Sequence, residues 1–214
     1  PTAMETAVGA DGADMKEYFQ GHINGVYPHF IDCVTTKKLV NSIVDLGVKI
    51  VSYIDDALPF KIKGQMQESL KDMLRGSDRH GFRVVHYPSV GPEVVLPRVD
   101  SRTDICFLTL LSAATTDGLE LQDSNGQWFR PSVGQDDILV LNADMLEMAS
   151  GAYVKATKHR VVATSFERRK GSRFSFPIFI HPRREVELQP DVTAMQALRK
   201  RISQVGFNGH LLKE

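Results

Sequence analysis

Cysteine is scarce in this 214-residue chain, and no hydrophobic run is long. Cys33 and Cys106 are its only cysteines, too few for a disulfide framework, which predicts reduced thiols in a cytoplasmic protein. No apolar stretch approaches the roughly 18 residues that a membrane span needs. The first residues lack a basic region followed by an apolar one, so no signal peptide is expected. Because the first residue is not Met, we expect a processed or truncated piece of a longer protein.

An excess of charge of either sign is also missing. The 26 basic and 26 acidic residues cancel, which argues against nucleic acid and against an anionic membrane surface as partners. Hydrophobic residues make up 42% of the chain and charged residues 24%. These shares are ordinary for a globular protein and exclude disorder as the main state. The length suits one domain, with or without a helical appendage.

The first half of the sequence predicts helices. Apolar residues recur at spacings of three, four and seven across residues 34–58, which is typical of one face of an amphipathic helix. Pro59 ends this pattern. A shorter helix is predicted over residues 64–75, with Gly76 at the position of a C-terminal cap. Residues 15–30 contain aromatic side chains without a clean period, and they are predicted to be irregular.

After Gly81 the pattern changes to short apolar runs separated by turn residues. Asn125-Gly126, between two such runs, is the strongest hairpin signal in the chain. Helical periodicity returns only over residues 192–205. Strands at this spacing predict an all-β barrel or a double-sheet jelly roll. The predicted strands are 82–87, 105–111, 119–122, 128–130, 138–142, 160–164 and 173–180.

We therefore expect one domain overall, organised in four consecutive segments. They are an N-terminal arm (1–30), a helical segment that packs on the core (31–80), the β core (81–182), and a C-terminal helix and tail (183–214).

Reactive residue types gather at the predicted strand ends. Asp104 is placed at the beginning of one strand and His159 at the beginning of another. Arg173 and Ser175 share one face of a third strand, since residues two apart point the same way. Tyr87 ends the strand 82–87. Each of these is weak evidence alone, because a single histidine at a strand edge is more often structural than catalytic.

Taken in order along the chain, the motifs of the β core resemble those of the non-haem iron, 2-oxoglutarate-dependent oxygenases, and within them the isopenicillin N synthase-like branch. That family has a His-x-Asp strand followed by Leu-Thr-Leu-Leu. The corresponding segments here are Arg102-Thr103-Asp104 with Leu108-Thr109-Leu110-Leu111, Gly118-Leu119-Glu120-Leu121-Gln122-Asp123, Gly126-Gln127-Trp128, Val140-Leu141-Asn142-Ala143-Asp144, His159-Arg160-Val161, Arg173-Phe174-Ser175-Phe176-Pro177 and His86-Tyr87-Pro88.

The resemblance implies a mainly β fold with a double-stranded β-helix (jelly roll) core and flanking helices. It also implies Fe(II) and 2-oxoglutarate as cofactors and a small molecule as substrate. By the same resemblance, Asp104 and His159 are metal ligands. Arg173 pairs with the far carboxylate of 2-oxoglutarate, since a guanidinium matches a carboxylate bidentately. Ser175 and Tyr87 add hydroxyl donors. The resemblance selects no substrate, and the oligomeric state stays open.

One residue departs from the family pattern, because Arg102 stands where the first histidine ligand belongs. Arginine stays protonated and offers no lone pair to a metal. An ion pair between Arg102 and Asp104 is therefore expected to compete with iron. Three explanations remain open. The arginine points away while Asp100 or water supplies the third ligand, the chain has lost iron, or the arginine was introduced by design or by sequence error.

Two functions follow from these alternatives. The first is a dioxygenase-type oxidoreductase, dependent on Fe(II) and 2-oxoglutarate, with an atypical or impaired metal site. The second is a catalytically inactive relative that binds a dicarboxylate or another organic anion at Arg173 and Ser175 without metal, with Arg102 as a fixed cation in the place of the metal.

Overall fold

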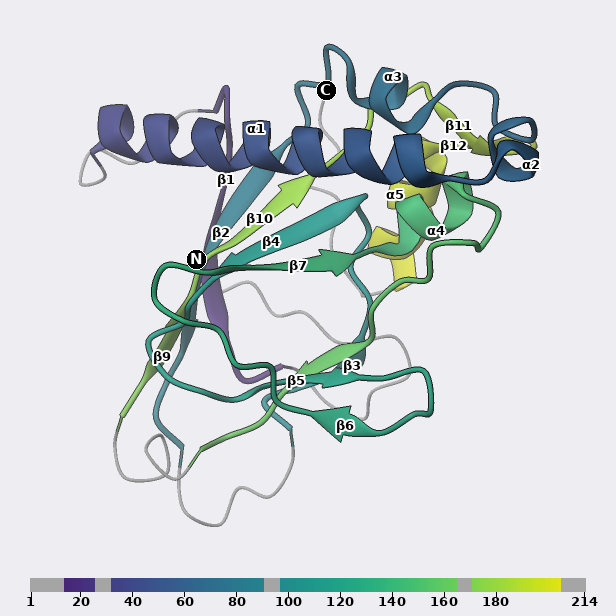
Figure 1. Ribbon diagram of the computed structural model, residues 1–214. Coiled ribbons are helices and arrows are strands. Elements are labelled where there is room, and N and C mark those ends of the chain that lie inside the picture. Colours follow the sequence, from purple (N-terminus) through teal and green to yellow (C-terminus); the bar gives the residue numbers. More distant parts are fainter. Residues whose placement is uncertain (1–13, 26–31, 91–96, 165–170, 205–214) are drawn as a thin grey trace.

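The computed structural model describes residues 14–25, 32–90, 97–164 and 171–204, and most of its strands form two antiparallel sheets that lie opposite each other (Figure 1). The larger sheet is built from β1 (Glu17–His22), β2 (Gly81–Tyr87), β4 (Leu108–Ser112), β7 (Ile138–Asn142), β9 (Arg173–Ser175) and β10 (Pro177–Ile180). The smaller sheet is built from β3 (Val99–Arg102), β5 (Leu119–Gln122), β6 (Trp128–Phe129) and β8 (His159–Val161). This arrangement confirms the predicted mainly β, jelly-roll fold.

The order of the strands places the ends of distant segments next to each other. The larger sheet runs β1-β2-β10-β4-β7, with β9 also paired to β2, and the smaller runs β3-β8-β5-β6. Strands β9 and β10 are a single predicted strand that breaks at Phe176, so that β9 pairs with the end of β2 and β10 with its beginning. A separate short ladder joins β11 (Glu187–Gln189) to β12 (Val192–Thr193).

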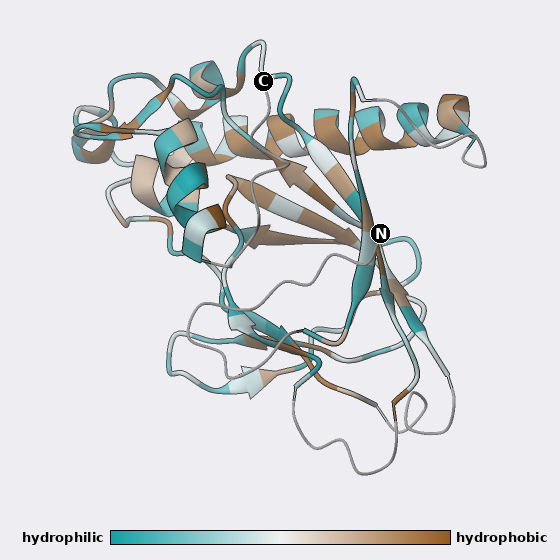
Figure 2. Ribbon diagram, turned by 180° about the vertical axis from the view of Figure 1, so that it is seen from behind, coloured by the Kyte–Doolittle hydropathy of each residue, from teal (hydrophilic) through white to brown (hydrophobic). Residues whose placement is uncertain are grey.

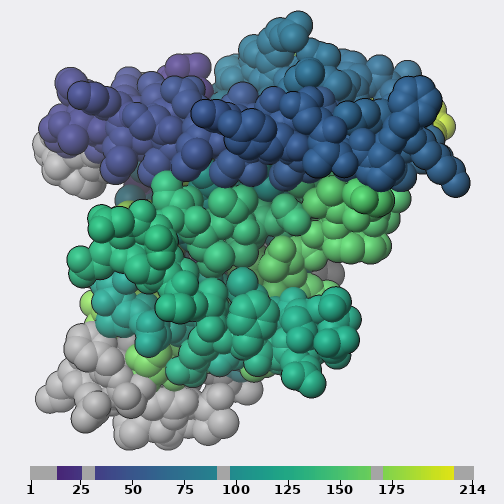
Figure 3. Space-filling model, in the orientation of Figure 1, coloured from purple at the N-terminus to yellow at the C-terminus, as the bar shows by residue number. Residues whose placement is uncertain are grey.

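Helix α1 (Cys33–Ala57) covers the outer face of the larger sheet, as Figures 1 and 3 show. Asp32 caps its beginning, since the carboxylate accepts hydrogen bonds from two backbone N–H groups of the first turn. Val40, Val44 and Val51 are buried against the sheet. The strands beneath are strongly hydrophobic (Figure 2). The predicted helix 34–58 is confirmed within one residue at each end.

The other helices are short and lie toward one end of α1. They are α2 (Phe60–Lys63), α3 (Leu70–Leu74), α4 (Asp144–Ala149) and α5 (Ala194–Gln204). The prediction of one helix over 64–75 is correct only for its second half, while Gly76 does take the left-handed conformation expected after a helix, with φ +74°. Helix α5 matches the predicted C-terminal helix, whose last position, 205, lies outside the described residues.

Three expectations about the strands were wrong. The segment 15–30 is not wholly irregular, because β1 pairs with β2 along all six of its residues. Strand β3 was missed, since its sequence Val-Asp-Ser-Arg has no apolar run and the strand is held by pairing with β8. Asp104 does not begin a strand. It lies in the loop between β3 and β4, because the strand predicted from residue 105 begins at Leu108.

The hairpin turn and the two cysteines agree with what the sequence predicts. The Asn125-Gly126 turn joins β5 to β6, and Gly126 has the positive φ, +80°, that such a turn needs. Cys106 is fully buried and Cys33 is exposed, and neither forms a disulfide. Within the described ranges, no helix combines the length and the apolar character that crossing a bilayer would require.

A glycine sets how closely α1 approaches the sheet. A Cβ atom on Gly47 would lie 2.6 Å from Cγ1 of Ile180, whereas one on Gly64 would meet no heavy atom closer than 3.5 Å. We expect Gly47→Val to lower the free energy of unfolding by about 1–3 kcal/mol, because overpacking forces the helix away from β10. Chemical denaturation measures this. Gly64→Val is the matched control, and equal losses for both variants would contradict the account.

Candidate active site

Asp104 is anchored through both its backbone and its carboxylate. Its carbonyl oxygen accepts a hydrogen bond from the N–H of Asp144 at 2.8 Å, and its Oδ2 accepts one from the hydroxyl of Thr109 at 2.5 Å. Its Oδ1 lies 3.8 Å from Nε2 of His159. An acid and an imidazole that are distant in the sequence therefore meet at one point of the structure.

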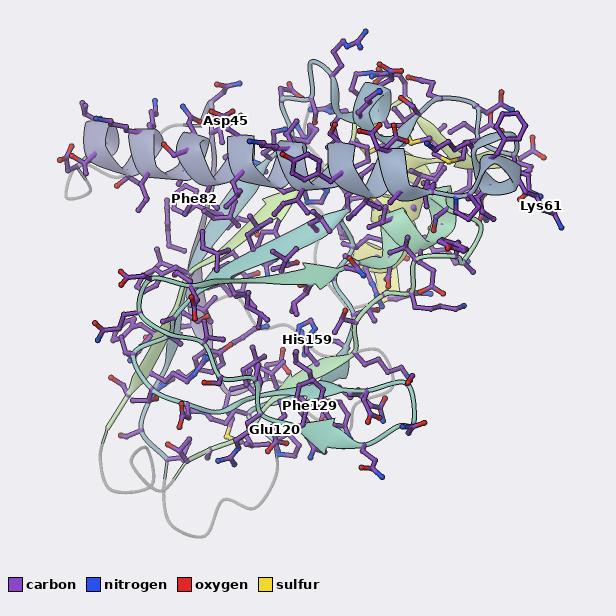
Figure 4. All side chains as sticks on the ribbon, in the orientation of Figure 1. Asp45, Lys61, Phe82, Glu120, Phe129 and His159 are labelled. Atoms are coloured by element: carbon purple, nitrogen blue, oxygen red, sulfur yellow. The ribbon has the colours of Figure 1, made fainter. Side chains whose placement is uncertain are left out.

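His159 begins β8 and lies between the two sheets (Figure 4). Its Nδ1 lies 3.3 Å from the carbonyl oxygen of Thr157. Because a carbonyl only accepts, Nδ1 carries the proton in this bond. In the neutral ring Nε2 then presents its lone pair toward Asp104. A backbone carbonyl that fixes the tautomer in this way is typical of histidines that bind metals.

The surroundings of Asp104 favour its ionised form. Burial raises the pKa of this carboxyl group, but the positive charge that His159 carries when it is protonated, the hydrogen bond from Thr109 and two nearby arginines outweigh that effect, so the pKa lies below its ordinary value. Metal ions bind the deprotonated carboxylate. The residue therefore has the charge state that a metal ligand requires.

Arg102 is held away from Asp104 by a different acid. Its Nη2 lies 2.6 Å and 2.5 Å from the two carboxylate oxygens of Asp14, and Lys16 approaches the same carboxylate at 3.0 Å. The side chain of Asp14 is only 2% exposed and that of Arg102 only 14%. The expected ion pair between Arg102 and Asp104 is therefore replaced by one with Asp14, although Arg102 lies opposite His159 in the β3–β8 ladder.

The guanidinium of Arg173 has unused hydrogen-bonding capacity. On β9, Arg173 is buried, and its Nε donates to the carbonyl oxygen of Thr116 at 3.0 Å. Its Nη1 is buried and has no hydrogen-bond partner within the described part of the chain. Ser175, two residues along the same strand, is buried as well. A buried donor without a partner is costly, and an anion would satisfy it.

Tyr87 lies beside Arg173 in the neighbouring strand. The two residues are paired in the β2–β9 ladder, and the Arg173 guanidinium carbon lies 5.0 Å from the centre of the Tyr87 ring. Burial raises the pKa of the phenol, which therefore stays protonated and able to donate. Its ring also keeps the guanidinium in place through a cation–π contact.

All of these side chains line one cavity of about 410 Å³ between the two sheets. Asp104 and His159 contribute from one part of its wall, and Arg173, Ser175 and Tyr87 from another. Apolar side chains of both sheets complete the wall, among them Val85, Val99, Leu119, Val161 and Phe179. The structure thus brings together Asp104, His159, Arg173, Ser175 and Tyr87, the residues that the resemblance assigns to the site, whereas Asp100 does not line this cavity. The arrangement places a carboxylate, an imidazole and a buried guanidinium around one hollow.

Comparison with known proteins supports the same family. The model of the 2OG-Fe(II) oxygenase superfamily matches residues 79–182. The β core of this chain is therefore similar to the proteins of this superfamily. Among curated proteins it is 24% identical to gibberellin 2-beta-dioxygenase 3 of Arabidopsis thaliana over 72% of this chain. It is 27% identical to 1-aminocyclopropane-1-carboxylate oxidase of Musa acuminata over 73%.

A solved structure of an oxygenase from Shewanella oneidensis superposes on this chain with a TM-score of 0.79 and 26% identity, covering 95% of this chain and 76% of that one. The curated relatives are longer. The aligned regions cover 44% of the gibberellin dioxygenase and 49% of the aminocyclopropanecarboxylate oxidase, so the chain spans about half their length. The more specific assignment to the isopenicillin N synthase-like branch stays a prediction.

The residues present fit the two cofactors of 2OG-Fe(II) oxygenases unequally. The unpartnered Nη1 of Arg173, with the buried Ser175 hydroxyl beside it, suits a carboxylate such as that of 2-oxoglutarate. For iron, only Asp104 and His159 are in place. Within the described ranges no group of three histidine, cysteine or carboxylate side chains could hold a metal ion. The expectation that Asp100 completes the set therefore fails.

Two residues important to this site were missed in the sequence. Thr109, which orients Asp104, lies within the Leu-Thr-Leu-Leu motif, and as the polar residue of an apolar strand it could have been recognised. Asp14, which neutralises Arg102, lies 88 positions away from it. No local pattern marks Asp14, since its role depends on where the N-terminal segment runs.

Removing the charge of Asp14 should destabilise the protein, because Arg102 is mostly buried. We expect Asp14→Asn to lower the free energy of unfolding by about 3 kcal/mol, because Arg102 then keeps a mostly buried charge without an ionised partner. Thermal and urea unfolding measure the change. Asp100→Asn, on β3 itself, is the control and should change stability by less than about 0.5 kcal/mol. A similar small effect at position 14 would contradict the importance of the ion pair.

Proposed function

We propose that this chain is a dioxygenase-type oxidoreductase that depends on Fe(II) and 2-oxoglutarate, oxidises a small molecule, and has a metal site weakened by the loss of one ligand. The observation that carries the proposal is the shared cavity of Asp104, His159 and Arg173, in which one guanidinium nitrogen finds no partner in the part of the chain that the structure describes. The cytoplasmic location expected from the sequence stays a prediction.

In this proposal Arg173 binds the far carboxylate of 2-oxoglutarate. Nη1 is available for it, while the bond from Nε to Thr116 and the ring of Tyr87 fix the orientation of the guanidinium. Ser175 adds a hydroxyl donor from the same strand, and the protonated phenol of Tyr87 is close to Arg173. Such a pre-oriented set of donors lowers the entropic cost of binding a flexible diacid.

Asp104 and His159 would hold the metal ion. Thr109 orients the carboxylate and the Thr157 carbonyl orients the imidazole, as outer partners do in metal sites. Iron bound there would supply the activation of dioxygen that couples decarboxylation of 2-oxoglutarate to oxidation of the substrate. The protein's own part is to present a carboxylate and a neutral imidazole on one side of the cavity, next to the place for the cosubstrate.

Arg102 favours a second candidate function, a metal-free relative that binds a dicarboxylate or another organic anion. Its guanidinium occupies the family's first ligand position and offers no lone pair. The further idea that Arg102 acts as a free cation toward the bound anion is less well supported, because Asp14 already neutralises its charge.

Restoring the missing ligand separates the two functions. If the site is an oxygenase site with one ligand replaced, Arg102→His should tighten Mn(II) binding at least about tenfold, and it should increase 2-oxoglutarate decarboxylation with Fe(II). The matched control is Arg102→Gln, which removes the same partner from Asp14 but adds no ligand. Anaerobic calorimetry and a decarboxylation assay measure both. Equal behaviour of the two variants would favour the metal-free function.

The anion site has its own test. We expect Arg173→Gln to weaken 2-oxoglutarate binding at least about tenfold, which corresponds to roughly 1.4 kcal/mol, because a charge-assisted pair in a buried place is lost. Arg130→Gln is the control, since Arg130 lines the same cavity but pairs with Glu120 and is largely exposed. Calorimetry with and without EDTA makes the measurement. Binding that survives in Arg173→Gln would overturn the assignment of this residue.

A further inference from the structure

A second cavity, of about 180 Å³, also has Asp104 in its wall. Residues of β1, β2 and β10 form one part of its wall, and residues of α5 form another. Asp104, Arg83, Arg102 and Phe179 line both cavities. A molecule in the second cavity would therefore reach Asp104 without contacting Arg173, which lines only the first cavity.

The lining of this cavity is rich in arginine and poor in acid. Two of its arginines are neutralised, Arg102 by Asp14 and Arg201 by Asp144. Two others, Arg79 and Arg184, are half-buried, and within the described ranges neither forms an ion pair with a carboxylate. Asp104 is the single carboxylate among the lining residues.

Arg79 and Arg184 also act on each other as like charges. Burial lowers the pKa of Arg79 and the positive charge of Arg184 lowers it further, while the neighbouring Asp78 compensates only in part. Two partly desolvated cations that face one cavity are unfavourable when the cavity holds only water. An anion placed between them would relieve that repulsion, and a guanidinium suits either a carboxylate or a phosphate.

The rest of the wall is apolar. Met145 of α4 and Met195, Leu198 and Ile202 of α5 line the cavity together with Phe179. The unbranched, flexible side chain of methionine adapts to apolar groups of irregular shape. A small inorganic ion would leave this part of the surface without a partner, whereas an organic anion with a hydrocarbon body would fill it.

We infer that the second cavity binds a small organic anion, with the acidic group between Arg79 and Arg184 and the apolar body against α5. The inference rests on the proposed function in one respect, because it makes this anion the substrate. Cosubstrate and substrate would then occupy different cavities that share Asp104, which places the substrate next to one of the two candidate metal ligands.

Calorimetric titration of the full chain with hexanoate, hexyl phosphate and hexanamide tests this inference. Saturating 2-oxoglutarate is present throughout, so that Arg173 is occupied. We expect one or both anions to bind at least tenfold more tightly than the neutral amide. Which anion binds distinguishes a carboxylate site from a phosphate site. Arg79→Gln and Arg184→Gln should each weaken binding of that anion about fivefold to tenfold, and Arg184→Lys should retain most of it.

Arg199→Gln is the matched control, since Arg199 is an exposed residue of α5 that does not line the cavity. Thermal unfolding of each variant verifies that it is folded. The inference is overturned if neither anion binds, if hexanamide binds as well as the anions, or if Arg79→Gln and Arg184→Gln behave like the control. Titration with 2-oxoglutarate alone tests the proposed function separately. If the chain binds the anion but does not bind 2-oxoglutarate, the anion site in the second cavity is supported and the proposed oxygenase function is refuted.

Discussion

The ion pair between Arg102 and Asp14 is the interaction on which the candidate active site depends. Arginine at this position brings a permanent positive charge to within reach of Asp104 and His159. Because Asp14 is almost completely buried and binds the guanidinium through both carboxylate oxygens, that charge is compensated locally. Asp104 therefore contacts Thr109 and His159 instead of Arg102. In this geometry the Asp104 carboxylate and the His159 imidazole can both bind a further partner.

The compensation comes from a segment outside the β core. Asp14 lies three residues before the first residue of β1, whose full pairing with β2 fixes the course of the N-terminal segment along the larger sheet. The fully buried Arg98 strengthens this, since its guanidinium donates to the carbonyl oxygens of Met15 and Pro88. The N-terminal segment is thus part of the active-site wall. An acid this far away in sequence can neutralise Arg102 because the sheet brings the two within hydrogen-bond distance.

The two cavities that share Asp104 differ in their lining. In the first cavity, a buried guanidinium has one nitrogen that finds no partner among the described residues, beside a serine and a tyrosine. In the second, two cations that form no ion pair within the described ranges lie at the edge of an apolar surface. Both cavities would accept acids, but of different shape. The first suits the end of a short diacid held by a precise set of donors, and the second suits a larger molecule that also makes apolar contacts.

Much of this protein follows from short-range patterns. The helical period over 34–58, the short apolar strands and the Asn125-Gly126 turn predict the long helix and a β barrel or jelly roll, because these patterns are local properties. The residues that meet in the site were implied only by the resemblance of the ordered motifs to those of a known family. Strands β1 and β3, the loop that carries Asp104, and the partner of Arg102 were decided by the tertiary structure. Pairing with a neighbouring strand can stabilise a segment whose own sequence has no strand pattern. The energy of an ion pair depends on the distance between the charges in space, and for Arg102 and Asp14 this distance is unrelated to their separation along the chain.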